Sequence, residues 1–231
     1  MTPVLEASPR PLRPSRTNGR IPPPLPPTGG GDGPDRDPAP RRPLIDNAVL
    51  ATIFVIGGEV MLFAGLVFSF LIIRVAAPVW PPTLEPRLPV EVTAANTVVL
   101  FFSSWAMVTA RRARARGDRR AFVRRLTLTA ALGGLFLAVQ GYEWFRLISF
   151  GLTASSGIYG STFYTLIGAH AAHVVAALAW LGVTLALARR GRFAGPEGPE
   201  GPAGGVVTAC ALYWHFVVAL WPILYVTVYL L

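Results

Sequence analysis

Five long runs of apolar residues constrain this sequence more than any other feature. They cover about residues 48–73, 92–110, 126–145, 159–188 and 206–231. A helix needs roughly 20 mainly apolar residues to cross a bilayer, and each run reaches or approaches that length. Hydrophobic residues make up 52% of the chain and charged residues only 14%, which argues against a soluble domain. We therefore predict an all-α, polytopic membrane protein, a bundle of five transmembrane helices.

The first 43 residues have a different composition from the rest of the chain. They are rich in proline, glycine and arginine and contain little that a core could bury. We predict a disordered cytoplasmic tail over residues 1–43, followed by the five-helix transmembrane domain over residues 44–231. The tail has no apolar h-region and so does not resemble a secretory signal peptide. Insertion must then be directed by the first helix.

Arginine placement predicts the orientation. All 21 basic residues are arginines, and the net charge is +9. Eighteen of them fall in the tail and in the segments 111–125 and 189–205, which we interpret as loops, while the others are Arg74, Arg87 and Arg146. Because basic loops stay inside, we predict a bacterial inner-membrane protein with a cytoplasmic N-terminus and an external C-terminus. No aromatic residues alternate with these arginines, so we expect membrane lipids and not nucleic acid as partners.

Glu59 is the most informative polar residue in the predicted spans. It lies about eleven residues into the first span, too deep for a short side chain to reach the headgroups. An ionisable group in hydrocarbon is costly unless it is paired, neutralised or facing protein. Two interpretations stay open. In one, Glu59 has a structural role, as a protonated carboxyl bonded to another helix or an acid facing a water pocket. In the other, it serves a proton path or binds a lipid headgroup.

Five further polar side chains lie in predicted spans. Gln140 and Glu143 are helical neighbours near the outer end of the third span, where we expect an interhelical hydrogen bond. His170 and His173 have the same i, i+3 spacing in the middle of the fourth span, and His215 lies in the fifth. The face of the fourth span that carries His173 should pack on protein.

Small residues follow one face of the fourth span at four-residue steps: Gly168, Ala172 and Ala176. Such steps let a second helix approach closely in a membrane. We therefore predict a close helix contact along this face.

Three histidines within predicted spans raise the question of a metal or haem. Di-iron bundles need several carboxylates with Glu-x-x-His pairs, and only two carboxylates lie near these spans. The single cysteine, Cys210, cannot build a thiolate metal site. We therefore predict no catalytic, cofactor-binding or metal-binding residue in this chain. A haem held by His170 or His173 together with His215 stays an alternative.

Several segments together resemble subunit III of the haem-copper terminal oxidases, in its five-helix form. They are GGEVMLFAGLVFSFLIIR (57–74), QGYEWFRLISFGLTASSGIYGSTFYTLIGAHAAHVV (140–175) and YWHFVVALWPILYVTVYLL (213–231), with the Asn96-bearing second span as the weakest match. The order SSGIYGSTFY, two histidines and a terminal YWHFV is specific, because no single packing requirement would generate all three. The resemblance extends from about Leu50 to the end.

This resemblance implies a non-catalytic subunit III of a respiratory oxidase of the cytochrome c oxidase type, acting in aerobic electron transport. Its partners would be subunits I and II, which would hold the haem and copper, so that oxygen reduction belongs to the complex. The chain would stabilise the catalytic subunit, support proton uptake and retain phospholipid. Glu59 would match the family's membrane-buried carboxylate. The other embedded polar positions of the family would be Gln140, Glu143, His170, His173 and His215.

Two departures from the family pattern accompany the resemblance. Seven-helix members carry two additional N-terminal helices, where this chain has its predicted tail. Val218 stands where the family usually carries an acid, so His215 lacks an acidic partner at i+3. Alternatives within the family are a quinol oxidase subunit III and a nitric-oxide-reductase-associated subunit. Alternatives from other classes are a small membrane transporter, which Glu59 favours, and a haem-binding anchor.

Overall fold

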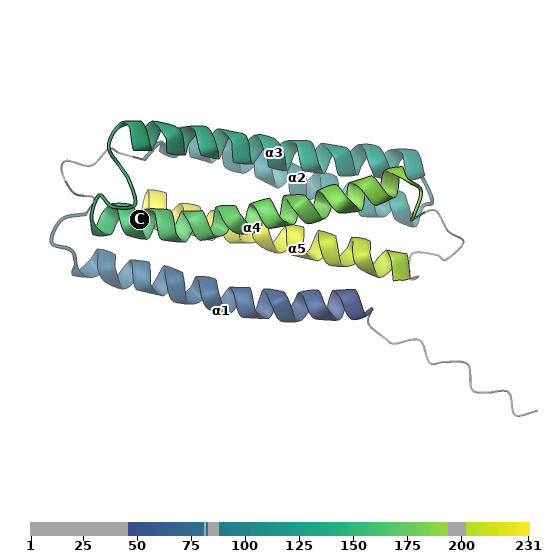
Figure 1. Cartoon of the computed structure of the whole chain (residues 1–231), viewed down its shortest axis with the longest axis horizontal. Coiled ribbons are helices and arrows are strands. Elements are labelled where there is room, and N and C mark those ends of the chain that lie inside the picture. The colour runs from purple at the N-terminus through teal and green to yellow at the C-terminus, as the bar shows by residue number, and fades with distance from the viewer. Residues whose placement is uncertain (1–45, 81, 83–87, 194–201) are drawn as a thin grey trace, which may run out of the picture. The chain divides into compact units, whose positions relative to one another are not determined.

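The computed structural model describes residues 46–80, 82, 88–193 and 202–231, and these residues form only helices, turns and loops. The helices are α1 (Asn47–Ala76), α2 (Val90–Ala115), α3 (Arg119–Ser149), α4 (Ile158–Arg189), α5 (Pro202–Tyr225) and the short π-helix η1 (Val226–Leu230). Figure 1 shows α1 to α5 side by side. Each is long and apolar enough to cross a membrane, which confirms the predicted all-α bundle of five. The predicted tail, residues 1–43, lies outside the described residues.

The arginine-rich segment 111–125 is mostly helical, so its interpretation as a loop was wrong for most of its length. Helix α2 continues to Ala115 and α3 begins at Arg119, with a short turn between them. Gly117 takes a φ of 73° in this turn. Asp118 caps α3, because its Oδ1 accepts from the backbone N of Ala121 at 2.9 Å. Arginine is a good helix former, and only the part of a helix inside the bilayer has to be apolar.

Helix α5 lies at the centre of the bundle and contacts α1, α2 and α4. Its two largest side chains, Trp214 and Trp221, are fully buried. Trp214 packs against Gly133 of α3, where any side chain would overlap with the indole ring. The ring of Trp221 meets Phe136 edge-on at 5.0 Å between centroids. The YWHFV segment of α5 is therefore largely core packing.

Polar side chains tie the helices together inside the core. Trp221 Nε1 donates to Thr97 Oγ1 of α2 at 2.8 Å. Asn96 Nδ2 of α2 donates to the backbone oxygen of Phe136 in α3 at 3.0 Å. A buried polar group without a partner is costly, so these bonds fix the register between neighbouring helices.

The SSGIYG segment forms the tight connection from α3 to α4. Ser156 Oγ donates to the backbone oxygen of Gly151 and accepts from the backbone N of Thr153, each at 2.8 Å. Gly157 precedes α4 with a φ of 95°, which L side chains rarely adopt. A side chain at Gly160 would overlap with the carbonyl oxygen of Thr153. The backbone geometry of this connection therefore accounts for the small residues of the segment, which needs no catalytic explanation.

The predicted contact along Gly168, Ala172 and Ala176 forms only in part. A side chain at Gly168 would reach the Trp144 ring of α3, at 3.8 Å. Ala172 and Ala176 are exposed, with no helix of the described residues covering them. The spacing of small residues indicates where another helix could approach, but it does not show whether a helix of this chain packs there.

The last helix that the structure describes is a π-helix, and it carries the buried Tyr229. Pro222 interrupts the hydrogen-bond ladder of α5 shortly before it. The backbone N of Leu231 donates to Val226 O, five residues earlier, at 3.0 Å. Three consecutive residues of η1 are buried: Thr227, Val228 and Tyr229.

Candidate functional site

Helix α1 buries only one narrow face against the bundle, and Glu59 lies on that face. The buried residues of α1 are Thr52, Phe63 and Phe70. The side chain of Glu59 is 14% exposed and points toward α4 and α5, because its contacts are with His173 and Tyr213. Glu59 therefore places a carboxyl group at the interface of α1 with α4 and α5, inside the predicted membrane region.

Three titratable side chains from three helices meet there, and we call Glu59, His173 and Tyr213 the Glu59 cluster. Tyr213 Oη donates to Glu59 Oε1 at 3.0 Å. His173 Nε2 lies 3.7 Å from the same oxygen. Glu59 Oε2 is buried and has no hydrogen-bond partner among the described residues. No arginine of the described residues takes part, so the cationic partner that the structure places beside Glu59 is His173, which can itself gain or lose a proton.

A hydrogen bond at the other side of the His173 ring fixes the position of one ring hydrogen. His173 Nδ1 lies 2.6 Å from the backbone oxygen of Ala169. A carbonyl oxygen can only accept, so Nδ1 carries a hydrogen. Nε2 then faces Glu59 either as the lone pair of a neutral ring or as the N–H of an imidazolium. At 3.7 Å the two groups are close enough to interact as an ion pair but are too far apart for a direct hydrogen bond.

His170 lies next to the cluster but has different surroundings. Its ring is buried, and neither nitrogen has a hydrogen-bond partner among the described residues. It stacks on Trp221 with 5.1 Å between ring centroids and an interplanar angle of 28°. Phe63 of α1 lies edge-on to both histidines, at 6.4 Å from His170 and 5.1 Å from His173. Phe63 thus anchors α1 to α4 beside Glu59.

Gln140 and Glu143 form a separate polar site where α3 approaches η1. Gln140 Nε2 donates to Tyr229 Oη at 3.3 Å, which is a bond between two elements. Glu143 is buried, but its partner is Arg146 on the same helix, at 3.4 Å between Nη1 and Oε1. The carboxylate of Glu143 is therefore paired with a permanent cation, unlike that of Glu59.

His215 belongs to a third site, between α5 and α2. Its Nδ1 is 2.7 Å from Ser104 Oγ. The hydroxyl of Ser104 supplies the partner that Val218 cannot, so His215 is satisfied from a neighbouring helix. Among residues 46–80, 82, 88–193 and 202–231, no three His, Cys, Asp or Glu side chains gather in a form suited to a metal ion.

Among the described residues, the one direct contact between two of the six predicted polar residues on different helices is that of Glu59 with His173. Sequence reasoning missed the partners that complete the three sites: Tyr213, Tyr229 and Ser104. Tyr213 opens the YWHFV segment and could have been singled out there. Nothing in the sequence pointed to Ser104, which lies 111 residues from His215.

Comparison with known proteins identifies the family. A profile described as cytochrome c oxidase subunit III matches residues 46–231. A cytochrome c oxidase subunit 3 of Synechocystis sp. is 34% identical over 186 residues, which are 80% of this chain and 76% of the relative. A cytochrome c oxidase subunit 3 of Corynebacterium diphtheriae is 35% identical, over 85% of this chain and 93% of the relative. That of Sus scrofa is 34% identical, over 74% of this chain and 64% of the relative. The chain therefore belongs to the cytochrome c oxidase subunit III family and is a subunit III of a haem-copper oxidase.

Proposed function

We propose that this subunit III is a non-catalytic partner in a respiratory complex of the cytochrome c oxidase type. Subunits I and II would hold the haem and copper, and this chain would stabilise the catalytic subunit. The breadth of the family match supports this role, since it covers every described residue. The wide apolar face of α1, including the exposed Phe54, Met61 and Phe68, is a surface suited to lipid or to a partner chain.

The orientation we propose follows from the arginines. Among the described residues, eight arginines lie between 111 and 125 and three between 189 and 192, whereas only Arg74 and Arg146 lie near the other end. The positive-inside rule places the arginine-rich end in the cytoplasm. In a bacterial inner membrane, the C-terminus at Leu231 would then be external.

Within the complex, the Glu59 cluster would support proton uptake. The observation that carries this role is the buried contact of a carboxyl group with a histidine and a tyrosine, without a permanent cation. In this role a proton would pass from Glu59 to His173 Nε2, so that a carboxylic acid and an imidazole become a carboxylate and an imidazolium. The net charge of the pair stays zero, so the move avoids the cost of an isolated buried charge. The hydroxyl of Tyr213 donates to the carboxylate that remains.

We assign the other polar residues to packing. Gln140, Glu143 and His215 each bond a fixed partner, and His170 stacks on Trp221. None of these contacts requires a proton to move. The contacts of Gln140, His170 and His215 would hold neighbouring helices in register, whereas that of Glu143 stays within α3.

The test replaces Glu59 by glutamine in the assembled oxidase and follows oxygen consumption over many turnovers. Glutamine keeps the shape and accepts the Tyr213 bond but cannot release a proton. We expect assembly at the wild-type level and an active lifetime about tenfold shorter, corresponding to roughly 1.4 kcal/mol in the barrier to inactivation. The dependence of the rate on pH should also change.

Glu143→Gln is the matched control, because it removes the other buried carboxylate of the bundle by the same chemical change. The proposal predicts that Glu143→Gln keeps the wild-type lifetime once the amount of assembled complex is equal. A wild-type rate, lifetime and pH profile for Glu59→Gln would refute the proton role and leave Glu59 a structural residue. Equal losses in both variants would refute it as well.

A further inference from the structure

The side chain of Asp46 touches two helices at once. Its Oδ1 accepts from the backbone N of Ala48 at 2.8 Å and thereby caps the first turn of α1. The same carboxyl group lies against Gly205 near the beginning of α5, where the methyl group of an alanine would overlap with it. One side chain therefore caps α1 and limits how closely α5 can approach it.

Gly205 is a glycine for reasons of space and not of backbone conformation. It lies within α5, and the described glycines with a positive φ are Gly117, Gly151, Gly157 and Gly191. Glycine weakens the interior of a helix relative to alanine, so a glycine with an ordinary helical conformation needs a packing reason. The carboxyl group of Asp46 supplies that reason, because it occupies the place of a side chain at position 205.

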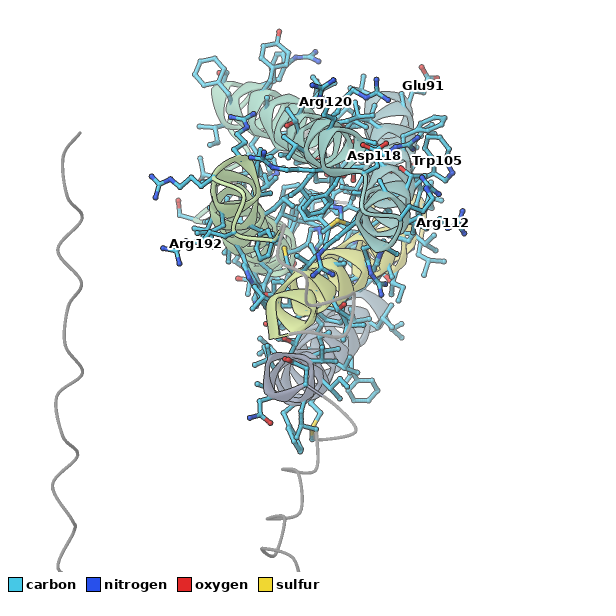
Figure 2. All side chains as sticks on the ribbon, turned by 90° about the vertical axis from the view of Figure 1, so that its right-hand side faces the viewer. Glu91, Trp105, Arg112, Asp118, Arg120 and Arg192 are labelled. Atoms are coloured by element: carbon cyan, nitrogen blue, oxygen red, sulfur yellow. The ribbon has the colours of Figure 1, made fainter. Side chains whose placement is uncertain are left out.

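The contact also places a negative charge where it stabilises α5. The first N–H groups of a helix have no partner within the helix, and a carboxylate near them is favourable. The first turn of α5 contains no acidic residue. Figure 2 looks onto the end of the bundle at which α1 and α5 begin, and Arg112, Arg120 and Arg192 lie around this end. Asp46 thus gives α5 an acid that its own first turn lacks.

The same two helices meet again at the Glu59 cluster, where Tyr213 of α5 donates to Glu59 of α1 at 3.0 Å. Helix α1 contacts mainly α4 and α5 and buries only three residues, so few points determine its position. Glu59 lies thirteen residues after Asp46, which is about 20 Å along a rigid helix. If α1 moves by about 1 Å at Asp46 and turns about its buried aromatic contacts, Glu59 moves by a few tenths of an ångström, which weakens a hydrogen bond that is already long.

We propose that Asp46 is a positioning residue for the Glu59 cluster. It fills the space that Gly205 leaves open and so sets the separation of α1 from α5. That separation in turn sets the hydrogen bond between Tyr213 and Glu59. The importance of Asp46 for turnover rests on the proposed function of the cluster, whereas the positioning itself holds whether or not a proton moves there.

Infrared spectroscopy of the complete oxidase complex tests the positioning. The band of the Glu59 carboxyl group is identified by its absence in Glu59→Gln, and Tyr213→Phe shows where this band lies without the hydrogen bond. We expect Gly205→Ala to shift the band in the same direction as Tyr213→Phe, because the added methyl group displaces Asp46. Gly65→Ala is the matched control, since its methyl group meets nothing within 4 Å. A wild-type band in Gly205→Ala, or an equal shift in Gly65→Ala, would overturn the proposal.

Asp46→Ala keeps the proposal testable if Gly205→Ala does not assemble, because it removes the carboxyl group and inserts nothing. Asp118→Ala is its control, since Asp118 caps α3 at the same end of the bundle (Figure 2). We expect Asp46→Ala to shift the Glu59 band and to raise hydrogen exchange in the first turns of α1. Asp118→Ala should raise exchange in α3 and leave the band unchanged. A shift of the band in both variants, or in neither, would refute the positioning role.

The active lifetime of the complex separates this proposal from the proposed function. Gly205→Ala should shorten the lifetime several-fold and should add no further loss in combination with Glu59→Gln, because Asp46 acts through Glu59. A further loss in the combined variant would overturn the link between Asp46 and the cluster. If Glu59→Gln itself keeps the wild-type lifetime, the proton role fails, and the infrared band still decides whether Asp46 positions Glu59.

Discussion

Helices α1 and α5 both run the length of the bundle and are both apolar enough to cross a membrane, but they are buried to very different extents. Only 11% of the residues in the most apolar stretch of α1 are buried inside the chain, against 56% in α5. Helix α1 is nevertheless the more apolar of the two. Hydropathy therefore identifies which segments enter the membrane, whereas the large side chains of α5 determine which segment forms the core.

The same contrast separates structure from proposed function. Helix α5 is held by large, fully buried side chains such as Trp214 and Trp221. Only a substitution that opens a cavity would disturb this packing. Helix α1 is held by a few aromatic contacts and by the Glu59 cluster. A polar group at a sparsely packed interface can change its protonation without disturbing the core. We therefore assign the proposed proton role to the Glu59 cluster at α1 and the larger contribution to the stability of the bundle to α5.

The largest expected effect on stability is that of Trp214→Ala in α5. The substitution opens a cavity against Gly133 and should lower the free energy of unfolding by about 3–5 kcal/mol. Thermal unfolding of the detergent-solubilised chain measures it. Trp105→Ala is the control, since the ring of Trp105 is 60% exposed. A similar loss in both variants would show that α5 is not the core that the structure describes.

A smaller and more local effect is expected for Phe63→Ala in α1. Phe63 is fully buried between α1 and the two histidines of α4, so its loss should cost about 2–4 kcal/mol, mostly in the attachment of α1. Hydrogen exchange should rise along α1 while α2 to α5 stay protected. Phe54→Ala, at a position 73% exposed on the same helix, should change neither the stability nor the hydrogen exchange of α1. Uniform loss of protection over all five helices would contradict a separately attached α1.

The sequence was sufficient to predict the number and type of helices, because span length and apolarity are local properties. It also singled out Glu59 and His173, since ionisable groups are rare in hydrocarbon. It could not show that they meet, nor that Tyr213, 154 residues from Glu59, completes the cluster. Such partners depend on the rotation of each helix about its axis. Long-range packing sets that rotation, as where Trp214 of α5 fits against Gly133 of α3.

Two further polar residues show the same limit. The sequence indicates that His215 lacks an acidic partner in its own helix, but it could not show that Ser104 of α2 supplies the bond. Glu143 was expected to bond another helix and instead pairs with Arg146 three residues later. In both cases the spacing along one helix shows which residues share a face. It does not show which neighbour that face meets.

The central claim is that Glu59 and His173 act as one unit that shares a proton, and a double-mutant cycle tests it most directly. The active lifetime of the assembled oxidase is measured for Glu59→Gln, for His173→Gln and for the variant with both changes. If the pair acts as a unit, either single change already removes its function, so the double variant should inactivate within about twofold of Glu59→Gln alone. Multiplication of the two single effects in the double variant would contradict the account.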